Sequence, residues 1–174
     1  MQRACHPALA HLLHIRAKME PLPSLSEVQS VAAEHAVLRA IFQQHQEALV
    51  GLLFVHALAD LEEFARRLHR HIRIEELTLL PAYAALADLP RTGAPEFFIQ
   101  EHRKIEEGLD DILNGMRSIS PGPGSSRAVV ALMDKETRFK SLLEHHEVRE
   151  EQDLFPRLTA AVSPGASNPS RRTA

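Results

Sequence analysis

Apolar side chains recur every three or four positions along most of the chain, which is the spacing of one face of an α-helix. Few segments alternate with a period of two, and clusters of β-branched residues are scarce. The pattern predicts four long helices, over about residues 26–53, 56–79, 95–119 and 127–162. Because short connections join these segments, we expect an all-α, up-down-up-down four-helix bundle.

Serine, proline and glycine residues mark the expected ends of these helices. Ser24 or Ser26 offers an N-cap, with Glu27 in the first turn. Pro81 should kink or end the second helix. We therefore divide the chain into an N-terminal extension (1–25) that could hold one short helix, a bundle (26–162) and a polar tail (163–174) that we expect to be disordered.

Composition and charge narrow the classes of function. A chain of 174 residues with 44% apolar residues is expected to form one globular domain. It contains no apolar run of about 18 residues, so we expect no membrane span. The net charge of −3 argues against nucleic acid as the main partner. A single cysteine, Cys5, cannot form an internal disulfide, which fits a cytoplasmic protein.

A repeated motif points to metal chemistry. Residues His71–Glu76 read His-x-x-x-Glu-Glu, and the same pattern recurs 75 positions later as His146–Glu151. On a helix, positions i and i+4 share a face, so the histidine and the first glutamate of each copy can point at one spot. A second, shorter echo pairs the dipeptide 34–35 with 101–102, both Glu-His.

The positions of these residues predict that they meet in one layer of the core. At ~1.5 Å per residue, His35 and His71 lie about 25 Å and about 23 Å from the first turn of the bundle. Each alone could be an ordinary hydrogen-bonded core histidine, but polar groups that converge in one buried layer are costly unless a ligand binds them. The expected layer contains His35, His71, Glu75, His102, His146 and Glu150.

The donor set indicates which metal would fit. Mixed imidazole and carboxylate ligands inside a bundle suit iron, with manganese or zinc as alternatives. The isolated Cys5 argues against a structural zinc site, and the chain contains no His-Glu-x-x-His sequence. It also lacks the Glu-x-x-His spacing of ferritin-like di-iron proteins.

Residues 26–160 resemble hemerythrin-like domains, also called HHE cation-binding domains. The resemblance rests on the two Glu-His dipeptides, on His71–Pro81 and on His145–Pro156, in this order along the chain. It implies a four-helix bundle that holds two non-haem iron ions joined by an oxygen bridge. It also implies that the six residues of the expected layer are the ligands, with Glu75 and Glu150 bridging the two ions.

Two positions depart from the pattern of the oxygen-carrying hemerythrins. Those proteins have a second histidine four residues after the first on the third helix, where this chain has Glu106. Their last-helix carboxylate corresponds to Glu151 rather than Glu150. Glu106 and Glu151 are therefore further candidate ligands. A centre richer in carboxylate favours ferric iron, which weakens the case for reversible oxygen carriage.

Three functions remain open at this stage. The first is a non-enzymatic protein that binds or senses oxygen, nitric oxide or iron. The second is a di-iron oxidoreductase that reduces oxygen or peroxide, for which Tyr83 is the only tyrosine available as a relay. The third is a structural bundle with incidental metal. A homodimer is compatible with each. A dry pocket for a small gas is expected from Phe42, Phe64, Leu68, Phe98 and Leu142.

Overall fold

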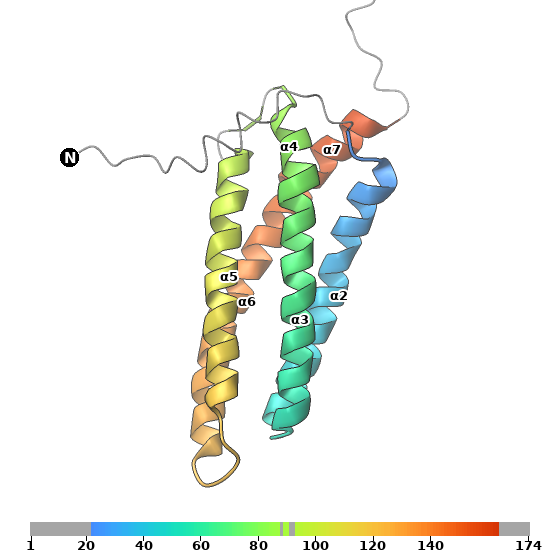
Figure 1. The fold of residues 1–174 in the computed structure, drawn as a ribbon. Helices are drawn as coiled ribbons and strands as arrows, with labels where there is room; N and C mark the ends of the chain where they lie inside the picture. The colour runs from blue at the N-terminus through green and yellow to red at the C-terminus, as the bar shows by residue number, and fades with distance from the viewer. Residues whose placement is uncertain (1–21, 88, 91–92, 164–174) are drawn as a thin grey trace, which may run out of the picture.

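The computed structural model describes residues 22–87, 89–90 and 93–163, and over these residues the fold is a four-helix bundle (Figure 1). The short helix expected near residues 8–19 and the tail beyond residue 163 lie outside this part of the chain. The long helices are α2 (Leu25–Val50), α3 (Phe54–Ile74), α5 (Pro95–Ser118) and α6 (Ser125–Arg149). The all-α, up-down-up-down prediction is confirmed.

The first helix begins where the sequence predicts. The Ser24 side chain accepts a hydrogen bond from the backbone N–H of Glu27 at 3.2 Å, and the Glu27 carboxylate accepts one from the Ser24 N–H at 2.6 Å. This reciprocal capping box satisfies two backbone donors that the first turn leaves free. The helix ends at Val50, three residues before the predicted end, because Leu52 adopts a left-handed φ of 58° that turns the chain into α3.

The regular α-helix α3 ends at Ile74, before Pro81, but the helical run continues past the proline. Helix α3 passes through a π-helical turn, η1 (Glu75–Leu79), into the short helix α4 (Leu80–Ala84). Helix α6 does the same through η3 (Glu150–Leu154) into α7 (Phe155–Val162). In each turn a backbone N–H reaches the carbonyl five residues earlier, that of Glu75 or Glu150. The wider turn accommodates Pro81 and Pro156, which lack the N–H and crowd the helix before them.

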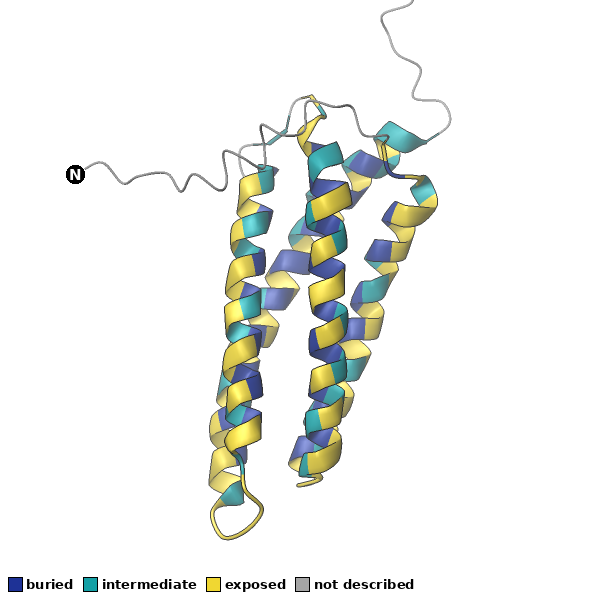
Figure 2. Ribbon diagram, viewed as in Figure 1, coloured by how far each residue is buried: buried dark blue, intermediate teal, exposed yellow. Residues whose placement is uncertain are grey.

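Buried positions run along each helix on one side (Figure 2), and the apolar ones form two clusters along the bundle. The larger one fills the half near the α2–α3 turn and contains Phe42, Phe64 and Phe139, whose rings lie 4.9–6.0 Å apart. The smaller one surrounds Tyr83 and Phe98, which meet edge to face at 6.0 Å. The polar layer predicted from the sequence lies between the two clusters, so apolar side chains exclude water from it on both sides.

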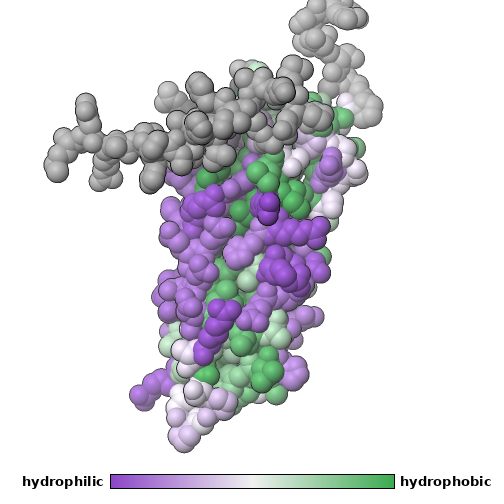
Figure 3. Space-filling model, in the orientation of Figure 1, coloured by the Kyte–Doolittle hydropathy of each residue, from purple (hydrophilic) through white to green (hydrophobic). Residues whose placement is uncertain are grey.

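The visible outer face is mostly hydrophilic, and hydrophobic side chains show between the polar ones toward both ends of the bundle (Figure 3). Exposed apolar residues include Val50, Leu52, Leu53 and Val55 around the α2–α3 turn. Within the described residues, no helix combines the length and apolarity needed to cross a bilayer.

Candidate metal centre

Six polar side chains from the four long helical runs converge between the two apolar clusters. His35 comes from α2, and His102 from α5. The other four come from the ends of α3 and α6. There each π-helical turn begins with a glutamate, and this glutamate pairs with the histidine one helical turn before it. All six are at least 95% buried: His35, His71, Glu75, His102, His146 and Glu150.

The six donors form two groups that share both carboxylates. One group contains His35 and His71, and the other contains His102 and His146, while Glu75 and Glu150 belong to each. Within each group, the donor atoms lie within 4.8 Å of one another.

Each carboxylate presents one oxygen to each histidine pair. Glu75 Oε1 lies 3.1 Å from His71 Nε2, and Glu75 Oε2 lies 3.3 Å from His102 Nε2. Glu150 repeats this arrangement, with Oε1 3.1 Å from His146 Nε2 and Oε2 3.2 Å from the Nε2 of His35. The two glutamates therefore lie in the positions that bridging ligands between two ions would occupy.

The geometry fits metal ions better than a network of hydrogen bonds. The Nε2 atoms of His35 and His71 lie 3.2 Å apart, and those of His102 and His146 lie 3.1 Å apart. Ligands held at ~2.0–2.2 Å from one ion are separated by roughly 3 Å. Among the described residues, the imidazole Nε2 atoms at 3.1–3.3 Å are the polar neighbours of the four buried oxygens of Glu75 and Glu150, and none of these contacts has hydrogen-bond geometry. Buried charged oxygens in this state are costly, and a bound cation would satisfy all four.

In the absence of metal, the imidazoles and carboxylates of the cluster shift one another's pKa values toward the charged forms. Burial alone would lower the pKa of His146, but the neighbouring carboxylates of Glu150 and Glu101 outweigh it and raise that pKa to about 10. Burial likewise opposes ionisation of Glu150, yet the adjacent imidazoles hold the pKa of its carboxyl well below the usual range. Without metal, the centre therefore retains protons that an incoming cation must displace.

A second layer of carboxylates contacts the His102–His146 pair at the Nδ1 atoms, on the side of each ring away from the cluster. His102 Nδ1 donates to Glu76 at 3.0 Å, and His146 Nδ1 donates to Glu101 at 3.1 Å. Burial alone would raise the pKa of Glu101, but the hydrogen bond from His146 and the charge of Arg149 lower it. Ligating histidines in metalloproteins commonly donate their second ring N–H to a carboxylate in this way.

The structure does not bring the other two candidate ligands into the cluster. Glu106 is half-buried, belongs to neither donor group, and pairs with Arg103 at 2.7 Å. The side chain of Glu151 is 55% exposed, and its Oε1 lies 3.7 Å from His35 Nδ1, behind the ring rather than beside Nε2. Of the eight residues proposed from the sequence, six therefore converge and two lie outside.

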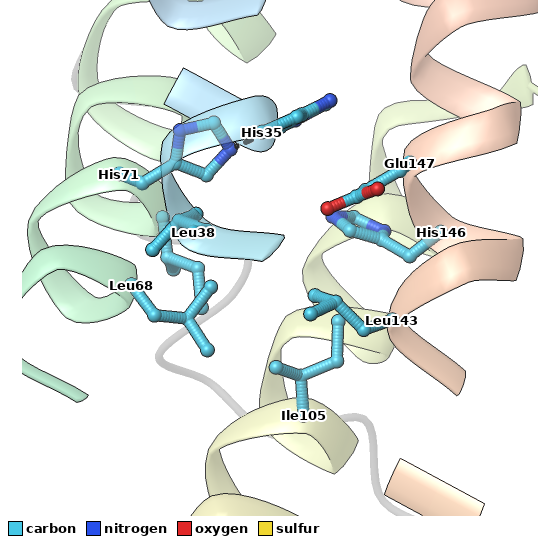
Figure 4. Close-up of a pocket in the computed structure, with 9 residues that line it drawn as sticks. His35, Leu38, Leu68, His71, Ile105, Leu143, His146 and Glu147 are labelled. Atoms are coloured by element: carbon cyan, nitrogen blue, oxygen red, sulfur yellow. Dashed lines mark hydrogen bonds between the residues drawn. The ribbon is translucent and has the colours of Figure 1, made fainter. Parts of the chain in front are cut away.

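A narrow hollow borders the cluster, and it is lined partly by a residue that the sequence analysis did not select. Its walls are mainly apolar, and it is too narrow to admit a water molecule. Glu147 points into it beside His146 and toward His35 (Figure 4). One Glu147 oxygen pairs with Arg39 at 2.5 Å, while the other is buried without a partner. Of the five residues expected to form a dry pocket, only Leu68 lines this hollow.

A second buried ion pair lies farther along the bundle, in the larger apolar cluster. His45 Nδ1 donates to the carbonyl of Ala57 at 2.7 Å, and its Nε2 lies 2.9 Å from Glu136 Oε1. Both side chains are fully buried. The sequence analysis did not select Glu136, although its spacing from Phe139 and Leu132 puts it on the inward stripe of α6.

Among the remaining histidines, His69 and His145 are exposed. Tyr83 is fully buried, and its hydroxyl has no hydrogen-bond partner among the residues that the structure describes.

Comparison with known proteins agrees with this geometry. The family model of the hemerythrin HHE cation-binding domain matches residues 26–158. No curated protein and no solved structure matches the chain significantly. The matched residues include all six converging side chains and the second layer of carboxylates.

Proposed function

The chain belongs to the hemerythrin HHE cation-binding domain family, and on this premise we propose that it holds a non-haem di-iron centre that binds or senses oxygen, nitric oxide or iron. The observation that carries the proposal is the sharing of Glu75 and Glu150 between two histidine pairs. Each carboxylate presents one oxygen to one histidine pair and its second oxygen to the other pair, and this arrangement suits two ions rather than one. Mixed imidazole and carboxylate donors favour iron, with manganese or zinc as alternatives.

The residues around the centre would control what reaches it. Bound iron would supply a reversible change of oxidation state and coordination positions for a small ligand. Leu38, Leu68, Ile105 and Leu143 form the apolar walls of the hollow beside the histidines. Because the hollow is too narrow for water, only a small molecule that displaces these side chains slightly would enter, which favours diatomic ligands over larger substrates.

Glu147 supports a second candidate function, the reduction of oxygen or peroxide. Its partnerless oxygen lies in the hollow, next to the histidine pairs, while Arg39 holds the other oxygen. A carboxylate in this position can accept and return a proton, which reduction of peroxide to water requires. Under this alternative, with an added reductant supplying two electrons per peroxide, Glu147→Gln slows multiple-turnover peroxide consumption and leaves iron content unchanged. Equal rates in both proteins count against it.

Metal content tests the main proposal directly. Protein purified from cells supplied with iron, manganese and zinc should contain about two iron ions per chain by elemental analysis. Its absorption spectrum should show an oxo-bridge band in the near ultraviolet that responds to dithionite and air. Glu75→Ala and Glu150→Ala should each lower iron content, and the double variant His71→Ala/His146→Ala should abolish it.

His145→Ala is the matched control for these variants, because His145 is exposed and adjoins His146. It should retain full iron content. If the ligand variants also keep full occupancy, the centre lies elsewhere. If the native protein binds no metal and melts at the same temperature after chelation, the bundle is structural and the proposal fails.

A further inference from the structure

The two halves of the centre are related by the sequence repeat, but their surroundings differ. Helix α2 corresponds to α5, and α3 corresponds to α6, so the His35–His71 pair matches the His102–His146 pair. The inner contacts are nearly equal in both halves, with histidine to carboxylate distances of 3.1–3.3 Å. Any difference between the two ion positions must therefore come from the next layer of side chains.

In one half, both imidazole rings are fixed from behind. His102 donates to Glu76 at 3.0 Å, and His146 donates to Glu101 at 3.1 Å. Each of these carboxylates is held in turn by an arginine. Arg103 donates to Glu76 at 2.8 Å, and Arg149 lies 3.1 Å from Glu101.

In the other half, neither equivalent contact forms. Glu151 takes the place of Glu76, but its oxygen lies 3.7 Å from His35 Nδ1, which is buried without a hydrogen-bond partner. Glu34 takes the place of Glu101, but its carboxylate is directed to Arg67 at 2.9 Å. Among the described residues, no carboxylate pairs with Nδ1 of His71.

The repeat itself shows why the halves differ. The positions that correspond to Arg103 and Arg149 hold Ala36 and Ile74. Neither side chain can anchor a carboxylate. Glu151 therefore remains over half exposed instead of being drawn onto the ring of His35. These two differences, Ala36 for Arg103 and Ile74 for Arg149, account for the missing anchors in the His35–His71 half.

We propose that the two ion positions are unequal: the His102–His146 position binds the first ion, and the His35–His71 position binds the second ion more weakly. This inference rests on the proposed two-ion centre. A carboxylate on Nδ1 orients the ring and makes Nε2 a better donor, and loss of such a contact costs roughly 10- to 100-fold in metal affinity. The first ion also occupies one oxygen of each shared carboxylate and repels the second.

The arginines do not reverse this order. Arg103 and Arg149 each lie behind a carboxylate, so their charge is separated from the ion position by both that group and the imidazole ring. The other half carries a comparable charge, because Arg67 lies behind Glu34 and Arg39 pairs with Glu147. The two halves differ in whether the carboxylate outside the ion positions also accepts a hydrogen bond from the Nδ1 atom of a ligating histidine. The weaker position is also the one whose two histidines both line the hollow, so the exchangeable ion faces the entering ligand.

A stepwise metal titration tests the inference without relying on activity. Metal-free protein with ¹⁵N-labelled histidine rings is titrated with zinc, a diamagnetic probe, and the ring resonances are assigned with single His→Gln variants. The first equivalent should shift His102 and His146, and the second should shift His35 and His71. Two bound ions with all four rings shifting together, or with His35 and His71 first, would overturn the inference and leave the proposed centre intact.

Variants of the second layer provide an independent measurement. Glu76→Gln and Glu101→Gln should weaken binding of the first ion by roughly 10- to 100-fold, because each removes the acceptor behind a ligating ring. The matched controls Glu151→Gln and Glu34→Gln should leave first-ion affinity unchanged. Equal losses in all four variants contradict the inference. Failure of zinc, manganese and iron to bind the native protein refutes the proposed function, and this inference with it.

Discussion

The stability of the metal-free protein should fall as the pH rises from about 6.5 to about 10, because His146 loses its proton over this range. The surrounding carboxylates raise the pKa of His146 from 6.5 to about 10 in the fold. A histidine whose folded pKa exceeds its unfolded value stabilises the fold below the unfolded pKa, and this contribution disappears as the pH rises through the folded value. The expected change is therefore a loss of stability toward alkaline pH.

The magnitude follows from the size of the shift. A rise from 6.5 to about 10, at ~1.36 kcal/mol per pH unit, corresponds to about 5 kcal/mol as an upper bound. Urea unfolding of the chelated protein across this pH range would measure it. His146→Gln should remove most of the slope, whereas His145→Gln, which changes an exposed neighbour, should retain it. Parallel curves for the native protein and His146→Gln would refute the reasoning.

Three further substitutions, at residues that are not candidate metal ligands, have predictable effects on stability. Tyr83→Phe removes a buried hydroxyl that has no partner, so chemical denaturation should show equal or slightly greater stability. Glu136→Ala leaves His45 without its buried partner and should cost about 3 kcal/mol in unfolding free energy, with zinc stoichiometry unchanged by elemental analysis. Ser24→Ala removes the cap of α2 and should cost about 1 kcal/mol in the same denaturation assay.

The sequence was sufficient to predict the bundle and the converging layer because both depend on helical periodicity. Val28, Val31, Leu38 and Phe42 recur at helical spacing along α2 and are all buried. The six converging candidate ligands lie on such stripes, so their inward direction follows from the same pattern. Helix ends were less predictable, as the left-handed turn at Leu52 shows.

What the sequence did not predict depends on contacts between helices. The burial of Glu147 depends on its pair with Arg39, which approaches from α2, and no pattern within α6 contains that contact. Glu136 did carry a local signal, since it occupies an inward position of its helix. It was missed because a glutamate at such a position is ordinarily expected in solvent, and its buried partner, His45, is 91 residues away.

The π-helical turns connect the prolines to the chemistry of the centre. Each turn begins at one of the shared glutamates, and its backbone N–H reaches the carbonyl of that glutamate from five residues later. The histidine four residues before each glutamate lies on the regular α-helix, so the histidine and the glutamate still share one helix face. The π-helical hydrogen bonding begins only after this pair. Leu79 and Leu154 close the two turns, and beyond them Leu80, Tyr83, Phe155 and Leu158 of the following helices join the smaller apolar cluster. Pro81 and Pro156 favour this wider turn over a regular one. The prolines therefore help to close the apolar layer above the two glutamates, and this closure keeps their four oxygens away from water.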